Sequence, residues 1–272
     1  MKRELKSDEE IHLKPVGSPK AQERELSELI TYMVDQMSRQ FKNQTFRQMS
    51  QGDVDKFADA QTGNYATVFL RMANRVRRKL VKRFNDDRID EIVGKMLHKV
   101  DKRNRDELYR LVEKNIGLST RELSATEGLK ANINALTLET TQWVKKLRDD
   151  VLEEYTAQSL RAMSHGLSLE EIMSQYDGLV EKRRDHVRFT ARNQIANFNS
   201  VSTKMRAQNL GITEAVWVTS RDGERVRESH QDRDGKTFEL SKGLYSSKDK
   251  KYLLPGVDYQ CRCTYELIIP AN

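Results

Sequence analysis

The sequence contains few of the residues that interrupt helices or crosslink small folds. Of its 272 residues, four are proline and two are cysteine, which excludes a disulfide framework. No apolar run approaches the roughly 20 residues that a membrane span needs, and the first residues lack the apolar centre of a signal peptide. We therefore expect a protein without a membrane span that stays in the compartment where it is made.

Common catalytic signatures are also missing. The sequence has no phosphate-binding GxxxxGK[ST] loop, no HExxH helix, no nucleophile elbow and no paired CxxC motif. Nothing of this kind therefore points to an enzyme, and we predict that the chain is not one.

The composition is rich in charge and poor in apolar residues. Hydrophobic residues make up 37% of the chain and charged residues 33%, and the formal net charge is +7. Such a balance indicates extended, solvated helices more than a thick core. The positive charge has two open interpretations, which are a polyanionic partner such as nucleic acid and a surface that serves solubility alone.

A long helical tract is the main structural prediction. Proline is absent from residue 21 to residue 210, as expected of uninterrupted helices. Apolar residues recur three or four positions apart in four segments, at residues 65–84, 88–114, 138–164 and 179–209. We expect Gly178 to end a short helix just before the last of these segments.

The sequence changes character after residue 210. Residues 214–220 have the β-branched and aromatic content of a strand, residues 236–240 predict a short strand, and residues 261–269 a closing strand. The predicted fold class is therefore α+β, with an extended, mainly α-helical N-terminal part followed by a small mixed α/β C-terminal module.

Three regions follow from these patterns. Residues 1–20, which are charged and broken by proline and glycine, are predicted to form a flexible arm. Residues 21–178 form the extended helical region. Residues 179–272 form the C-terminal module, which begins with a long helix and ends in a small β-rich part.

A basic stripe follows one face of the helix expected at residues 65–84. Its members are spaced three or four residues apart: Arg71, Arg75, Arg78 and Lys82. The stripe has two interpretations, a surface that contacts DNA phosphates without sequence preference and a solvated helix face.

The C-terminal module holds an unusual set of residues, which we call the motif set. In chain order it consists of Trp217, Asp222, Arg225, Arg227, His230, Asp234, Gly235, Pro255, Gly256, Cys261, Arg262 and Cys263. Trp217 and Trp143 each fall on an apolar pattern, which favours a place in the core over a platform for base stacking.

His230 has three open interpretations: a residue that orients a turn, a metal ligand, or a general base. Cys261 and Cys263 would share one face of a strand, so that they and His230 could bind zinc. A fourth ligand would be needed, and Asp232 and Asp234 are the candidates. Otherwise both cysteines are ordinary strand residues.

The arginines of the motif set have two interpretations. Arg225, Arg227 and Arg262 could contact phosphates, or they could brace the turns by pairing with Asp222 and Asp234. Phosphate contacts beside a histidine base would suit a nuclease, so the candidate catalytic residues of an enzyme would be His230, Arg225 and Arg227.

The ordered motif set resembles the phage head-morphogenesis or minor head family, typified by the F-like protein of phage Mu. The resemblance covers roughly residues 140–270 and begins with Ala191-Arg192 on the long helix. Family members often continue with Thr-Glu, whereas this chain has Asn193-Gln194. Glutamine cannot exchange a proton as a carboxylate does, which weakens any acid/base role for this helix.

The resemblance implies a minor capsid protein of a tailed phage, assembled in the host cytoplasm and located in the virion, in the head interior or portal region. The implied partners are the portal protein, the scaffold or the major capsid protein, together with packaged or ejected DNA. The module is also similar in fold to small metal-independent ribonucleases, which keeps a ribonuclease-like or toxin-like enzyme as the alternative.

Overall fold

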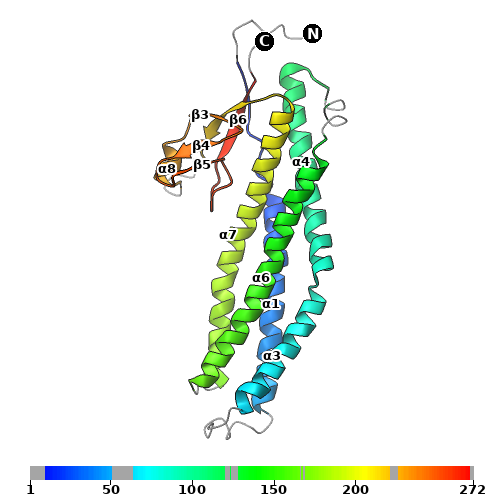
Figure 1. Cartoon of the computed structure of the whole chain (residues 1–272), viewed down its shortest axis with the longest axis vertical. Helices are drawn as coiled ribbons and strands as arrows, with labels where there is room; N and C mark the ends of the chain where they lie inside the picture. The colour runs from blue at the N-terminus through cyan, green and yellow to red at the C-terminus, as the bar shows by residue number, and fades with distance from the viewer. Residues whose placement is uncertain are drawn as a thin grey trace. The chain divides into compact units, whose positions relative to one another are not determined.

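The computed structural model describes residues 10–50, 64–119, 123, 128–165, 167, 169–220 and 226–269. Long helices account for most of this part of the chain (Figure 1). They are α1 (Lys20–Ser50), α3 (Asn64–Arg83), α4 (Asp86–Ile116), α6 (Lys130–Ser164) and α7 (Leu169–Asn209). Among these described helices, none combines the length and apolar character that crossing a membrane requires.

Short strands and one short helix follow α7, and one strand precedes α1. The strands are β1 (Ile11–Leu13), β2 (Glu214–Val218), β3 (Thr237–Glu239), β4 (Leu244–Ser246), β5 (Lys251–Leu253) and β6 (Thr264–Ile269), and the helix is α8 (Glu228–Gln231). One antiparallel sheet has the order β1-β6-β2-β3, and β4 and β5 form a second. The predicted α+β fold class is confirmed.

The chain divides into two compact units, each assembled from separate stretches. The first unit comprises Met1–Arg24, Lys95–Leu138 and Phe189–Asn272, and the second comprises Glu25–Gly94 and Glu139–Arg188. Helices α1, α4, α6 and α7 each contribute to both units. The boundary predicted at residue 178 lies inside α7 and does not separate the units.

The second unit is built from helices whose apolar stripes pack together. The rings of Phe41 and Tyr155 stack with centroids 5.3 Å apart, and Tyr155 meets Tyr176 edge-on at 5.2 Å. Arg148 of α6 donates hydrogen bonds to the Phe84 carbonyl oxygen at 2.8 Å and to Asp86 Oδ1 at 2.7 Å. These contacts fasten α6 to α1, to α7 and to the start of α4.

Helix α7 continues through Gly178, so the expectation that this glycine ends a short helix is wrong. Glycine inside a helix costs about 1 kcal/mol relative to alanine. Ile172, Tyr176 and Val180 are all buried and lie on one face of α7 across the glycine. Burial of this continuous stripe offsets the local cost, so tertiary packing overrides the propensity of one residue.

The core of the first unit lies between its four-stranded sheet and the segments of α4 and α7 that belong to it. Tyr109 and Val112 from α4 and Ala207 from α7 are buried with Trp217 of β2 and Leu267 of β6. In Figure 1 the strands gather beside the C-terminal end of α7, drawn in yellow. The sheet therefore uses its apolar face to cover these helices.

The N-terminal segment completes this sheet, so the predicted flexible arm over residues 1–20 is wrong for Ile11–Leu13. These residues form β1, which pairs antiparallel with β6 in the register Ile11↔Ile269 and Leu13↔Leu267. The Leu13 side chain is fully buried. Alternation of Ile11, His12 and Leu13 is a short strand pattern that the surrounding charged residues obscured.

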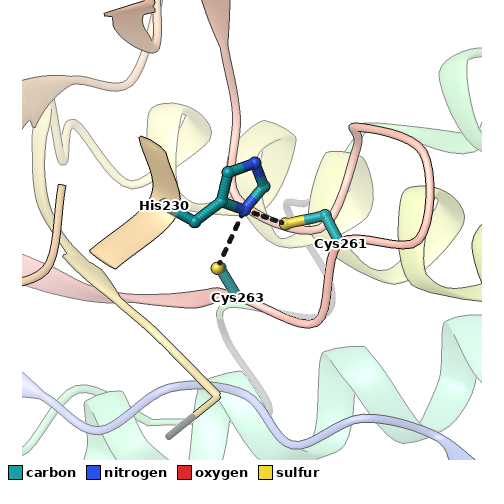
Figure 2. Close-up of side chains that lie close together, drawn as sticks. All are labelled: His230, Cys261 and Cys263. Atoms are coloured by element: carbon teal, nitrogen blue, oxygen red, sulfur yellow. Dashed lines mark hydrogen bonds between the residues drawn. The ribbon is translucent and has the colours of Figure 1, made fainter. Parts of the chain in front are cut away.

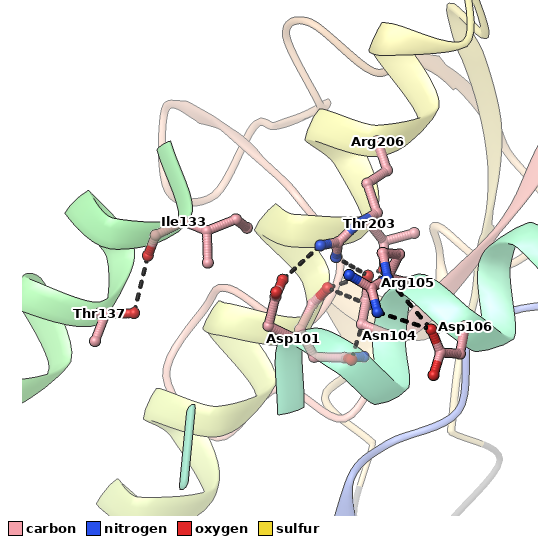
Figure 3. A network of polar contacts seen from close by, with 9 residues as sticks. Asp101, Asn104, Arg105, Asp106, Ile133, Thr137, Thr203 and Arg206 are labelled. Atoms are coloured by element: carbon pink, nitrogen blue, oxygen red, sulfur yellow. Dashed lines mark hydrogen bonds and ion pairs between the residues drawn. The ribbon is translucent and has the colours of Figure 1, made fainter. Parts of the chain in front are cut away.

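A buried polar network joins α4 to α7 within the first unit. Figure 3 shows Arg206 of α7 reaching toward Asp101 and Asn104 of α4. The Arg206 side chain is 1% exposed and donates to Asn104 Oδ1 at 2.7 Å. Asn104 Nδ2 in turn donates to Thr203 Oγ1 at 2.7 Å and to the Asn199 carbonyl oxygen at 3.0 Å. Each buried polar group thus finds partners on the other helix.

We predict that Arg206→Met lowers the free energy of unfolding of the first unit by about 3 kcal/mol, because it removes a buried guanidinium and leaves partly buried Asp101 without its cation. Chemical denaturation in a Trp143→Phe background would measure this, since Trp217 is then the remaining tryptophan of the chain. The control is Arg105→Gln, which removes an exposed pair with Asp106 (Figure 3) and should cost less than about 1 kcal/mol. Equal losses in the two variants would contradict the prediction.

Candidate functional site

The described members of the motif set converge where β2 ends and β6 begins. The register of the two strands places Trp217 opposite Tyr265 and Val218 opposite Thr264. Residues that follow β2 therefore lie next to residues that precede β6. Helix α8, which carries His230, leads into β3, the other neighbour of β2. Motif residues that are far apart in the sequence are thus brought to one end of the sheet.

His230, Cys261 and Cys263 form a compact cluster at this end (Figure 2). His230 Nδ1 lies 3.5 Å from Cys261 Sγ and 3.4 Å from Cys263 Sγ. All three side chains are buried, and one ligand atom from each lies within 4.8 Å of the others. Figure 2 shows both sulfur atoms pointing toward the same ring nitrogen. The structure therefore brings together the three residues that the sequence proposed as metal ligands.

Both cysteines precede the closing strand, so the strand predicted at residues 261–269 begins later, at Thr264. A turn places them in a loop, with the Cys261 N–H donating to the Asp258 carbonyl oxygen at 2.9 Å. Gln260 and Gly256 have positive φ angles of 55° and 83°. The loop conformation, and not strand alternation, directs the two sulfur atoms to one side.

The two thiols differ in acidity because they share one hydrogen bond. The hydrogen bond from Cys263, followed by those from His230 and the Gly256 N–H, lowers the pKa of Cys261 to about 5 despite burial. The same Cys261–Cys263 interaction, together with burial, raises the pKa of Cys263. The pair therefore holds one negative charge readily, and a second requires a nearby cation.

Further contacts hold the cluster in place. The Gly256 N–H donates to Cys261 Sγ at 3.3 Å, so the Pro255-Gly256 turn of the motif set supports a sulfur ligand. Asp258 Oδ2 lies 3.5 Å from His230 Nε2 and accepts a hydrogen bond from Arg227 Nη1 at 2.8 Å. Asp258 was not predicted from the sequence. Its position between Pro-Gly and Cys-Arg-Cys was the one signal that pointed to it.

Helix α7 positions the loop that carries the cysteines. Ser200 Oγ donates to the Pro255 carbonyl oxygen at 2.6 Å, and the Gln260 N–H donates to Asn193 Oδ1 at 3.0 Å. Asn193 stands where the resemblance leads one to expect threonine, and its longer side chain reaches the loop backbone. At this position the departure from the family pattern therefore has a structural role.

Trp217 is a core residue, as its apolar pattern indicates. Its side chain is fully buried, its ring meets the His230 ring edge-on at 5.7 Å, and the Arg233 guanidinium lies 5.1 Å from its centroid. The indole forms one wall beside the cluster and leaves no face for a nucleic-acid base. Trp143 of α6 is half-buried.

The two aspartates proposed as the fourth metal ligand do not join the cluster, so that expectation is wrong. Asp234 Oδ1 accepts a hydrogen bond from the Thr219 N–H at 2.8 Å, directly before Gly235, whose φ angle is 73°. Asp232 is exposed at the end of α8. Among the described residues, His230, Cys261 and Cys263 are the members of the cluster.

The arginines lie around a cavity beside the cluster. This cavity has a volume of about 350 Å³ and is lined by Arg192, Arg227, Arg262, His230 and both cysteines. Arg227 braces a turn by pairing with Asp258, which was not among the partners considered from the sequence. Asp222 and Arg225 lie outside the described residues.

The basic stripe predicted on α3 lies on the surface. Arg71, Arg75, Arg78 and Lys82 are all exposed, while Met72, Val76 and Leu80 between them are buried. Helix α3 contains no Asp or Glu, and three further basic residues lie on it: Arg77, Lys79 and Arg83. All charged side chains of this helix are therefore positive, and the four residues of the basic stripe are exposed.

Comparison with known proteins agrees with the resemblance seen in the motif set. Residues 153–266 match the family described as "Phage Mu protein F like protein", which confirms the suspected family for this stretch and relates the chain to phage head proteins. The match begins before the module boundary predicted at residue 179.

One curated relative is an uncharacterized protein of Haemophilus influenzae. It is 25% identical over 238 residues, which cover 87% of this chain and 52% of the relative. The chain therefore spans about half the length of this relative. No solved structure matches the chain.

We predict that Asp234→Ala lowers the free energy of unfolding by about 1–2 kcal/mol, because the Thr219 N–H loses its acceptor. Asp234→Asn keeps a side-chain oxygen and should retain most of the stability. Urea denaturation of the full chain measures both changes. Asp232→Ala is the matched control, with an expected change within about 0.5 kcal/mol for an exposed position. A loss in Asp234→Asn as large as in Asp234→Ala would contradict the proposed hydrogen bond.

Proposed function

We propose that the chain is a minor head protein of a tailed phage, which acts in head morphogenesis near the portal. It is incorporated into the virion, where it contacts the portal protein, the scaffold or the major capsid protein. Its role is structural, and it associates with packaged or ejected DNA without sequence preference.

The family match over residues 153–266 is the observation that carries this proposal. The described members of the motif set support it, because they form one connected structure at the end of β2 and β6. Trp217 packs on His230, Arg227 pairs with Asp258, and Gly256 contacts Cys261. The motif therefore specifies a particular local fold, as expected of a structural module.

Helix α3 supports the DNA part of the proposal. Its exposed basic stripe matches the linear array of phosphates along a duplex, and phosphate contacts carry no base information. The head interior, where DNA is concentrated, would supply the ligand at high local concentration. Weak contacts would then suffice.

The burial of His230 does not favour the enzyme alternative, a ribonuclease-like or toxin-like activity. Its side chain is 3% exposed, and its Nδ1 faces the two thiols. A general base must come within hydrogen-bonding reach of the proton that it removes, which this position denies to a bulky RNA substrate.

If the chain is a virion protein, mass spectrometry of purified particles should detect its peptides in procapsids, in mature heads or in both. The measurement requires particles from a phage that encodes this chain, with a cytoplasmic host protein as the contamination control. Absence of its peptides from both kinds of particle would falsify the structural role.

We predict that the basic stripe binds duplex DNA with a strong salt dependence. Four phosphate contacts give a slope of log affinity against log salt of roughly −3 to −4 through counterion release. Changing Arg71, Arg75, Arg78 and Lys82 to Gln keeps most of the helix propensity and should remove this dependence. Fluorescence anisotropy with two unrelated duplexes over a salt series measures both the slope and the lack of sequence preference.

A matched control removes the same charge from another surface. Lys242, Lys248, Lys250 and Lys251 are exposed residues at and around the β4–β5 hairpin, and their change to Gln should leave the slope nearly unchanged. Equal slopes for wild type and the stripe variant would show that α3 does not contact phosphates. Equal losses in both variants would assign the binding to net charge alone.

A further inference from the structure

We propose that His230, Cys261 and Cys263 bind one zinc ion, with the fourth position open to a ligand from the adjoining cavity. This inference goes beyond the proposed function and does not depend on it. It rests on the geometry of the cluster, on its charge balance and on the contacts that surround it.

The distances within the cluster suit a tetrahedral zinc ion. With Zn–N near 2.0 Å and Zn–S near 2.3 Å, tetrahedral angles place a ligating nitrogen about 3.5 Å from each sulfur. The structure has His230 Nδ1 at 3.5 Å from Cys261 Sγ and 3.4 Å from Cys263 Sγ. Both nitrogen–sulfur separations thus match those that a shared ion requires, and all three donor atoms lie within 4.8 Å of one another.

Charge favours a divalent cation at this position. Two thiolates and a neutral imidazole around Zn²⁺ have no net charge, which makes the buried assembly far less costly than an isolated buried charge. Sulfur and imidazole ligands together favour zinc over calcium or magnesium, which take oxygen ligands.

The surrounding contacts are those that stabilise a metal centre. Ligating histidines usually donate their second ring N–H to a carboxylate, which fixes the tautomer and orients the ring. Asp258 Oδ2 lies 3.5 Å from His230 Nε2, and Arg227 holds that carboxylate from the other side. The Gly256 N–H donates to Cys261 Sγ, which stabilises a thiolate. Two residues of the motif set therefore support the ligands: Arg227 holds Asp258 beside His230, and Gly256 donates to Cys261.

The fourth ligand comes from the cavity. His230, Cys261 and Cys263 line it together with Arg192, Arg227 and Arg262. Its volume of about 350 Å³ admits water, and the arginines favour an anion. A site with three protein ligands and one exchangeable position is a common zinc arrangement.

Elemental analysis of the full chain, purified without a histidine tag or chelator, should find about one equivalent of zinc. Cobalt added to metal-free protein should give the visible bands of a tetrahedral ion and an ultraviolet thiolate-to-cobalt charge-transfer band. Less than about a tenth of an equivalent after zinc supplementation of folded protein would overturn the proposal, as would a cobalt complex without the thiolate band.

Variants separate ligation from folding. Cys263→Ser and His230→Gln should each lower zinc content at least several-fold, whereas His230→Cys supplies another zinc ligand and should retain the metal with a stronger thiolate band. His98→Gln changes an exposed histidine and is the matched control, with unchanged zinc content. If Cys263→Ser or His230→Gln fails to fold, the wild-type cobalt spectrum and His230→Cys still decide. Retention of full zinc content by folded Cys263→Ser and His230→Gln would overturn the assignment.

Discussion

The antiparallel pairing of β2 with β6 is the interaction on which the C-terminal structure depends. Its register places the end of β2 against the start of β6, so that the loop after one strand and the loop before the other share one edge. A slip by one residue would turn Trp217 and Tyr265 away from the core. It would also move both cysteines out of reach of His230.

Helix α7 connects this sheet to the rest of the first unit through directional hydrogen bonds. Arg206 bonds with α4, Ser200 with Pro255 and Asn193 with Gln260. The Tyr265 hydroxyl donates to the Ser200 carbonyl oxygen at 2.6 Å, and burial raises the pKa of this tyrosine. Because each bond is directional, the helix fixes the position of the loop more closely than apolar packing alone would.

The sequence predicted the features that repeat regularly or depend on a single residue type. Helical periodicity identified both ends of α3 and α4 closely, but for α6 only the C-terminal end, because the helix begins at Lys130 and not at residue 138. The β-branched content identified β2. Three features required tertiary information: the continuation of α7 through Gly178, the pairing of β1 with a strand near the other end of the chain, and the loop that precedes β6. In each case, contacts between distant segments decided the conformation of a short stretch whose local pattern was ambiguous.

For the candidate site, the sequence was sufficient to predict which residues could bind a metal, but not which residues contact them in the fold. His230, Cys261 and Cys263 have the chemistry of metal ligands wherever the fold brings them together, so composition was sufficient to single them out. Asp258 belongs to no recognisable pattern, and its role follows from its distance to His230 alone. Asp232 and Asp234 were close to His230 in the sequence, but the turn after α8 directs Asp234 to the Thr219 backbone.

The place of β1 in the sheet has a consequence for how the protein is made. One neighbour of β6 comes from residues 11–13, so the sheet closes only after residues 264–269, which form β6, have left the ribosome. Pairing over so long a sequence separation raises the contact order and slows folding. Until β1 docks, one edge of β6 presents unpaired N–H and carbonyl groups that invite association between chains. A fragment limited to residues 153–266 would lack both β1 and residues 267–269, the part of β6 that pairs with β1, which makes it a poor substitute for the full chain.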